Sequence, residues 1–153
     1  MTAALHVVFR PARGALAALP ARHVRETMRP LPIEPLAGAP SFVAGAAIVR
    51  GRAVPVVDAA TLFSGARDER DAATRWIAIV VGDRDAVLAV HSVVGVRALA
   101  ATNDAVAPLL ARSARGAIAE LSTLDGELLA ILQTAKLVDE EVWRAIAGQD
   151  DAR

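Results

Sequence analysis

Histidines and carboxylates are the side chains in this 153-residue chain that could carry out acid–base chemistry or hold a metal. The three histidines are His6, His23 and His91, and no pair has the close spacing of metal ligands on one helix face. His91 and Ser92 are adjacent, so on a strand they point to opposite faces and cannot form a nucleophile–base pair. We therefore interpret the histidines as isolated structural or surface residues, and we expect no metal or other cofactor.

The acidic clusters also have structural explanations. Residues 67–71 read RDERD, and this alternation of basic and acidic side chains is typical of a solvated loop, not of paired catalytic carboxylates. Asp139, Glu140 and Glu141 stand where they would favour the positive end of a helix dipole. The chain contains no GxSxG elbow, no GxGxxG loop and no phosphate-binding loop. No nucleophile, base and orienting group can be assembled, which disfavours an enzyme.

Composition excludes further classes of function. Seventeen basic and seventeen acidic residues give a formal net charge of zero, which removes the long-range attraction that nucleic-acid binding relies on. No segment approaches the roughly 18 consecutive apolar residues of a membrane span, so no direct membrane insertion is expected. The start of the chain does not resemble a signal peptide, and the absence of cysteine suits a reducing compartment. We expect a cytoplasmic protein.

The stretch that the other elements must position is residues 45–63, GAAIVRGRAVPVVDAATLF. Two apolar runs flank Arg50, Gly51 and Arg52, which predicts a β-hairpin with a tight basic turn. Gly51 can adopt a positive φ there at no steric cost. An arginine at such a turn is ordinarily a solvated surface residue.

The returning strand and the residues after it carry two further signals. Pro55 cannot donate to a ladder, so we expect this strand to be an edge strand or Pro55 to sit at a bulge. Asp58 is positioned to cap a short helix that carries Leu62 and Phe63. Upstream, Val24, Glu26 and Met28 would share one face if residues 23–28 are extended, although a helical turn also fits their spacing.

The rest of the chain reads as short strands separated by turn signals, which indicates a mainly β protein with an antiparallel barrel or sandwich. Pro108 limits a brief helix at 102–110, and Trp143 would pack a C-terminal helix on the body or serve as an exposed partner anchor. We expect one domain over residues 4–148 and a polar tail over 149–153. The predicted segments are a strand at 5–9 with its hairpin partner at 15–20, a proline-stiffened connector at 30–40, a loop at 64–74, a hairpin of 76–81 with 86–90, a strand at 93–96, a hairpin of 118–124 with 128–132, and a helix from Asp139 that stops at Gly148.

These residues resemble the CheW family, the coupling proteins of bacterial chemosensory arrays. The resemblance is most specific in Pro40, Phe42, Val43, Gly45, Arg50, Gly51 and the run VPVVD at 54–58. It extends to an opening strand at 7–9, a second strand at 19–26 and a last hairpin within 118–138. It implies a fold of two small five-stranded β-barrels packed together, with a short C-terminal helix, which the periodicity alone does not show.

The resemblance also implies the site residues. Arg50 matches a position implicated in partner contacts, and Val24 and Glu26 match positions on the second strand that are associated with coupling. The predicted partner-binding residues are Arg50, Glu26, Val24, Ile48 and Val57, and the predicted structural residues are Gly45, Gly51, Pro55 and Asp58. Taken alone, a single Glu is more often a surface residue and a Val more often core.

The function that the resemblance implies is a scaffold that bridges chemoreceptor tips and the regulatory domain of a CheA-type histidine kinase. A CheW-like regulator of another process, such as pilus-based surface motility, is the alternative that the sequence leaves open. Ile48 stands where the family usually has Asn, His91 where it more often has Asp, and Glu120 where it tends to have Gly. These departures leave open whether the set of partners has diverged.

Overall fold

A computed structural model describes residues 3–67, 73–100 and 116–151 of the chain. The helical segments are η1 (Ala21–His23), α1 (Ala59–Ser64), η3 (Thr134–Lys136) and α3 (Glu140–Asp151), of which η1 and η3 are short 3-10 helices. The strands are β1 (Ala4–Arg10), β2 (Ala17–Pro20), β3 (Val24–Met28), β4 (Val43–Val49), β5 (Arg52–Asp58), β6 (Arg75–Val81), β7 (Arg84–Val90), β8 (Ser92–Leu99), β9 (Ile118–Leu124) and β10 (Glu127–Leu132).

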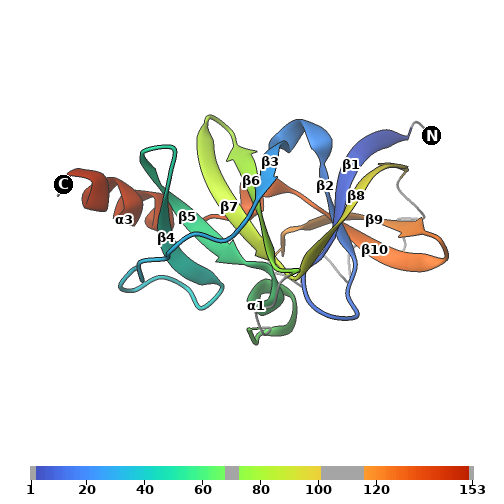
Figure 1. The fold of residues 1–153 in the computed structure, drawn as a ribbon, viewed down its shortest axis with the longest axis horizontal. Helices are drawn as coiled ribbons and strands as arrows, with labels where there is room; N and C mark the ends of the chain where they lie inside the picture. Colours follow the sequence, from blue (N-terminus) through green and yellow to red (C-terminus); the bar gives the residue numbers. More distant parts are fainter. Residues whose placement is uncertain (1–2, 68–72, 101–115, 152–153) are drawn as a thin grey trace.

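The strands form two five-stranded sheets that lie side by side along the long axis of the molecule (Figure 1). Sheet A has the order β8-β1-β2-β10-β9, and sheet B has the order β3-β6-β7-β5-β4. The chain starts in sheet A, builds sheet B, returns to complete sheet A, and ends with α3 packed beside sheet B. Most neighbours are antiparallel, but β2–β10 and β5–β7 are parallel pairs. The mainly β class and the two five-stranded units are therefore confirmed.

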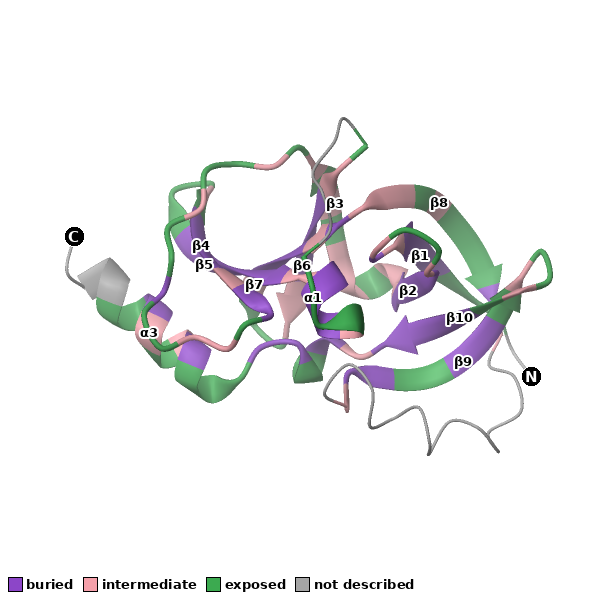
Figure 2. Cartoon of the chain, turned by 90° about the horizontal axis from the view of Figure 1, so that it is seen from below, coloured by how far each residue is buried: buried purple, intermediate pink, exposed green. Residues whose placement is uncertain are grey.

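The expectation of closed barrels needs one correction. Figure 2 shows strands curving round within each half of the molecule, but in the described residues β3 and β4 remain the two edges of sheet B. The outer edge of β4 is occupied by the connector, because Ala46 and Glu34 exchange two backbone hydrogen bonds of 2.8 Å each. A strand edge bonded in this way cannot also pair with β3. The sheets are curved and open.

The segment expected as one second strand, residues 19–26, is divided between the two sheets. Its first part belongs to β2, which pairs with β1 as predicted, and its last part belongs to β3 in sheet B. The turn η1 lies between them and follows Pro20. Val24 and Met28 of β3 are half-buried and pack against different clusters, so the spacing of apolar residues does not reveal the change of sheet.

The predicted hairpins β4–β5, β6–β7 and β9–β10 are confirmed. Pro55, however, is not on an edge strand, because β5 lies between β4 and β7. Its partner Ala46 directs its own backbone N–H and C=O to Glu34, so Ala46 and Pro55 are not hydrogen-bonded to each other. The parallel ladder with β7 begins only at Val56. The missing N–H of Pro55 therefore removes no ladder bond.

One buried cluster joins the two sheets. It contains Phe9 and Leu19 of sheet A, Ile77 and Leu88 of sheet B, and Ile146 of α3. A second cluster belongs to sheet A alone, and a third fills the concave side of sheet B around Trp76, which is 1% exposed. The sheets are thus held together by apolar burial, since the described backbone ladders do not connect them.

The C-terminal helix differs from its expectation at one end. It begins after Asp139, whose carbonyl accepts hydrogen bonds from the N–H groups of Val142 and Trp143, but it continues through Gly148 to Asp151. Gly148 has nothing within 4 Å of an added Cβ and no positive φ, so nothing there stops the helix. The brief helix expected at 102–110 and part of the loop at 64–74 lie outside the described residues.

Candidate partner-binding site

The tip of the β4–β5 hairpin is a two-residue turn with an unusual backbone. Arg50 has φ +53° and Gly51 has φ +80°, while Arg52 pairs with Val49 and belongs to β5, not to the turn as expected. Two positive φ values are what a type I′ turn requires. Glycine meets that requirement freely, but a left-handed conformation costs a non-glycine residue about 1 to 2 kcal/mol. Such local strain is found most often at functional sites.

The Arg50 guanidinium forms an ion pair with the Glu26 carboxylate of β3. This pair joins the tip of the hairpin at one edge of sheet B to the strand at its other edge, so a side-chain contact spans the opening that the backbone leaves. The pair is accessible, with side-chain exposures of 72% for Arg50 and 36% for Glu26. The two residues that we expected at a partner interface thus lie together on the surface.

A second ion pair lies beside the first. The Nε atom of Arg25 is 2.7 Å from the Oδ1 atom of Asp85, at the start of β7. The two pairs surround a hollow of about 170 Å³ whose apolar side includes Val54 and Val87. Neither Arg25 nor Asp85 was predicted from the sequence. The charged turn at residues 82–85 could have indicated Asp85, because a hairpin places the side chains of its turn at one end of the sheet, where they can meet the tip of another hairpin.

A β-bulge in β3 lies between Val24 and Glu26 and changes which face of the strand each side chain occupies. Val24 pairs with Ile79 and Glu26 with Ala78, which leaves Arg25 as the extra residue. Val24 consequently packs against the cluster between the sheets, whereas Met28 packs against the cluster inside sheet B. The expectation that Val24, Glu26 and Met28 share one face is therefore wrong.

The other predicted partner-binding residues have different exposures. Ile48, two residues before the arginine, is 41% exposed beside the hairpin tip. Val57 is fully buried in the cluster between the sheets, so any effect of Val57 on binding has to act through the core. Ile48 lines a second hollow of about 250 Å³ with Leu31, Pro32 and other apolar residues.

The predicted structural residues occupy defined places. Gly45 has φ +148°, and a Cβ there would lie 2.2 Å from the carbonyl oxygen of Glu34, so only glycine permits the connector to bond to β4. Asp58 caps α1, since its carboxylate accepts a hydrogen bond from the Thr61 N–H at 3.2 Å and contacts the Thr61 hydroxyl. The helix then ends at Gly65 in a left-handed conformation.

The histidines are placed apart. The Nδ1 atom of His6 lies 2.8 Å from the Ala4 carbonyl oxygen, and that of His23 lies 3.5 Å from the Thr134 hydroxyl. His91 joins β7 to β8, and its backbone N–H donates to the Arg10 carbonyl at 2.8 Å. Within ranges 3–67, 73–100 and 116–151, no three His, Cys, Asp or Glu residues are grouped as a metal site would need.

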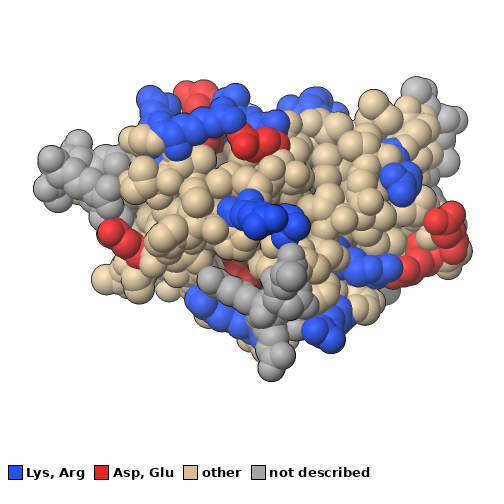
Figure 3. Space-filling view, viewed as in Figure 1, with Lys and Arg blue, Asp and Glu red and all other residues tan. Residues whose placement is uncertain are grey.

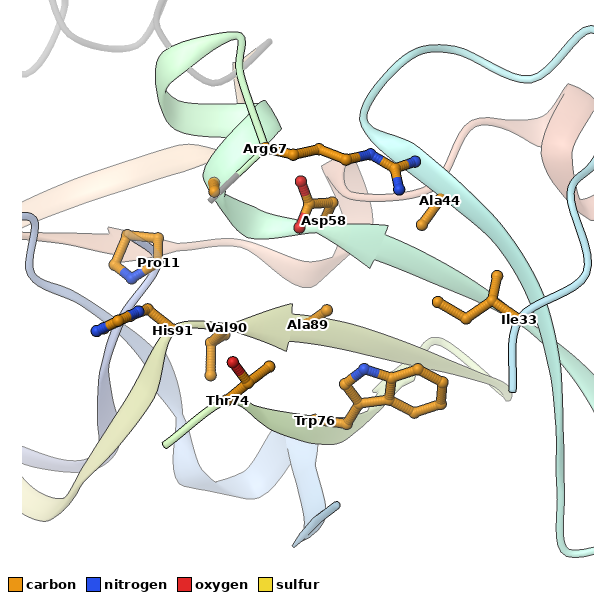
Figure 4. Close-up of a pocket in the computed structure, with 11 residues that line it drawn as sticks. Pro11, Ile33, Ala44, Asp58, Arg67, Thr74, Trp76, Ala89, Val90 and His91 are labelled. Carbon is orange, nitrogen blue, oxygen red and sulfur yellow. The ribbon is translucent and has the colours of Figure 1, made fainter. Parts of the chain in front are cut away.

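Figure 4 shows the cavity that His91 lines, together with Asp58 and Trp76. Its volume is about 40 Å³, which holds a few water molecules at most. His91 points away from Trp76, and Arg67 extends above Asp58. The carboxylate of Asp58 is already committed to the α1 cap. This cavity therefore offers neither the room nor the groups for substrate chemistry.

The family model for the CheW-like domain matches residues 6–142. The chain belongs to the CheW-like family. A crystal structure of the scaffolding protein TtCheW from Thermoanaerobacter tengcongensis has the same fold, with a TM-score of 0.74 at 19% sequence identity. The match covers 91% of this chain and 89% of the TtCheW chain. Among curated proteins, none matches this chain.

Membership of the CheW-like family supports an adaptor role in a chemosensory system and disfavours an enzyme. This membership places the protein in chemotaxis and signal transduction, with a scaffolding role. Across the described part of the chain, no helix is both long enough and apolar enough to cross a membrane.

Proposed function

We propose that this CheW-like protein is a non-catalytic adaptor that couples the cytoplasmic tips of methyl-accepting chemoreceptors to the regulatory domain of a CheA-type histidine kinase. It acts in the cytoplasm by association alone. The observation that carries the proposal is the exposed Arg50–Glu26 pair at a hairpin tip whose backbone is unfavourable for arginine.

The kinase contact is assigned to the Arg50 tip. A guanidinium has five N–H donors in a planar fork, so Arg50 can keep Glu26 while it binds a carboxylate of the kinase, or exchange one for the other. Ile48 adds exposed apolar area next to the charge. An interface with a central arginine and an apolar neighbour has the composition of binding hot spots.

The receptor contact is assigned to the edge of sheet A. Leu5 of β1 and Val96 of β8 are 61% and 54% exposed, and Val94 on the same strand is 39% exposed. Val96 pairs with Val7, which is buried in the cluster between the sheets, so this exposed apolar strip continues the face that sheet A turns towards sheet B. Figure 3 shows few charged side chains over β1 and β8. Apolar side chains of a receptor tip can be buried there.

The proposal is tested by titrating the purified protein separately with a kinase regulatory domain and with a receptor-tip fragment from the same cell. Saturable binding to both is expected, with Leu5→Ser weakening only the receptor complex. A pull-down from the native cell identifies the partners. Recovery of neither a histidine kinase nor a receptor, together with no binding in either titration, would contradict the proposal.

One observation favours a diverged partner set, such as that of a surface-motility pathway. Ile48 replaces the Asn that the family usually has beside the turn arginine, and its side chain is exposed, not absorbed into the core. A partner that binds this site must therefore cover the aliphatic side chain of Ile48, whereas a partner of a typical family member meets the side-chain amide of Asn. Ile48→Asn separates the two cases, because it should strengthen binding to a typical chemotaxis kinase and weaken binding to the native partner.

A further inference from the structure

A large hollow lies between α3 and the tips of the β4–β5 and β6–β7 hairpins. Its volume is about 470 Å³, within the range of sites that take ligands or side chains of a partner. The floor is apolar, since Val54 and Ile146 are 4% and 5% exposed. The residues around it that matter here are Arg52, Asp83, Arg84, Glu140, Trp143 and Arg144.

Some of the charged side chains around this hollow form ion pairs, and others have no partner among the described residues. The Arg84 guanidinium donates one hydrogen bond to each carboxylate oxygen of Glu140, at 3.3 Å each. Asp85 also lines the hollow and forms an ion pair with Arg25. Arg52 and Arg144 are exposed and have no ion-pair or hydrogen-bond partner within the described ranges. Of the acidic residues that line it, Asp83 alone has no described partner. Two uncommitted cations thus face one uncommitted anion.

Side-chain contacts of Arg84 link the two walls of the hollow. The same guanidinium that binds Glu140 lies 5.0 Å from the centre of the Trp143 ring, so Arg84 fixes α3 to the β6–β7 tip by an ion pair and a cation–π contact. Figure 3 shows Lys and Arg side chains gathered over these hairpin tips with acidic side chains among them.

We propose that this hollow is a second docking site, which binds an acidic peptide segment of a partner protein that also carries an aliphatic side chain. Arg52 and Arg144 receive the carboxylates in two-point hydrogen bonds, and the aliphatic side chain covers Val54, Ile146 and the accessible part of Trp143. From the sequence alone, Arg52 reads as an ordinary surface residue. The two arginines of this site, unpaired within the described residues, select acidic groups of the partner, and the apolar floor selects an aliphatic side chain among them.

This site does not depend on the function proposed for Arg50. The hollow beside Arg50 and Glu26 is a separate one, and the two have only Arg52, Val54 and Asp85 in common. Arg144 lines only the α3 hollow. A variant at Arg144 therefore reports on the second site, and a variant at Arg50 reports on the first.

The test uses the full chain, labelled with ¹⁵N, and the capped peptide Glu-Leu-Glu-Glu-Leu-Glu as the probe. The chain has two Trp residues, and Trp76 is buried, so the Trp143 indole N–H is a specific reporter of the hollow. We expect the peptide to shift this resonance and the amides of α3. Arg144→Ala and Arg52→Ala should each weaken binding about tenfold, whereas Arg50→Ala and the matched surface control Arg29→Ala should not.

Three outcomes would overturn the proposal. The first is no shift of the Trp143 indole at about 1 mM peptide, where even a very weak site would be half occupied. The second is an equal response to the capped peptide Lys-Leu-Lys-Lys-Leu-Lys, which would show that only the apolar floor binds. The third is a shift of the same resonances with protein concentration alone, which would identify a second copy of the chain as the occupant.

Discussion

Arg50 combines the exposure of a surface residue with the backbone of a glycine position. Its ion pair with Glu26 is solvated on both sides, and exposed pairs of this kind contribute about 0 to 1 kcal/mol to stability. Local stability therefore gives little reason for an arginine at φ +53°. Recognition of a partner gives a better one, because the guanidinium at this tip is 72% exposed beside Glu26 and can bind a carboxylate of a partner.

The first prediction is that Arg50→Ala separates binding from stability. The free energy of unfolding should change by about 0.5 kcal/mol or less, as for ordinary surface substitutions. Affinity for the kinase regulatory domain should fall by about 2 to 5 kcal/mol, because a partner carboxylate is left unpaired in a desolvated interface. Thermal unfolding and titration measure the two quantities, and Arg29→Ala is the matched control. Unchanged affinity for both proposed partners would make Arg50 a solvated turn residue.

The second prediction concerns the strain itself. Arg50→Gly removes the same guanidinium as Arg50→Ala but also relieves the left-handed conformation, at the expense of greater entropy in the unfolded chain. We expect the glycine variant to be about 1 kcal/mol more stable than the alanine variant and equally defective in binding. Chemical denaturation of the two proteins measures the difference. A less stable glycine variant would show that the turn does not carry this strain.

The third prediction is a dependence of stability on pH that comes from His23. Burial lowers the pKa of His23 below its ordinary value of 6.5, and the neighbouring charge of Arg22 lowers it further. The unfolded chain therefore binds a proton more readily than the folded one, so stability is complete above pH 6.5 and declines as the pH falls towards the folded pKa. The melting temperature should drop less between pH 7.5 and 5.5 in His23→Gln than in the natural sequence. Equal drops would exclude this role.

At the scale of elements, the hairpins could be predicted from sequence because their information is local. Asp125 and Gly126, with φ +51° and +80°, form the turn that an Asp-Gly pair predicts, and the cap of α1 by Asp58 follows from one residue type at one position. A glycine at the turn locates each hairpin, but its charged neighbours can belong to the strands, as Arg52 and Arg84 do.

What could not be predicted depends on contacts between distant segments. The parallel pairings of β2 with β10 and of β5 with β7 leave no mark on either strand, and without them Pro55 looks like an edge residue. The extra residue Arg25 in β3 shifts the register by one position, which alternation alone does not reveal. The ion pair of Arg50 and Glu26 likewise requires the curvature of sheet B, and only the family resemblance brought the two residues together.

The fourth prediction tests the inner cluster of sheet B. Trp76 pairs with Met28 and is packed with Val54, Val56 and Val87, with 1% of its surface exposed. Trp76→Ala should cost about 3 to 5 kcal/mol, because it leaves a cavity between strands that the other clusters cannot fill. Denaturant unfolding measures the loss. A cost near 0.5 kcal/mol would place Trp76 at the surface.

At the scale of the molecule, two sheets with separate hydrogen-bond ladders are made into one unit by a shared core. Phe9 and Leu19 of sheet A are fully buried against a cluster that also contains Ile77 and Leu88 of sheet B. The two proposed binding surfaces lie on different sheets, with Arg50 on sheet B and Leu5 on sheet A. An adaptor that links two partners needs these surfaces held at a fixed relation, and the shared core provides that relation without a moving part.

The last prediction follows from this shared core. If the sheets unfold as one unit, a substitution in the cluster that belongs only to sheet A must lower the protection of sheet B equally. Leu129 is 1% exposed and packs in that cluster, so Leu129→Ala should cost about 2 to 5 kcal/mol. Native-state hydrogen exchange should then show the slowest amides of β7 losing the same free energy as those of β1. Unchanged protection in β7 would mean that sheet B survives without sheet A, and the fixed relation between the two proposed binding surfaces would then need another cause.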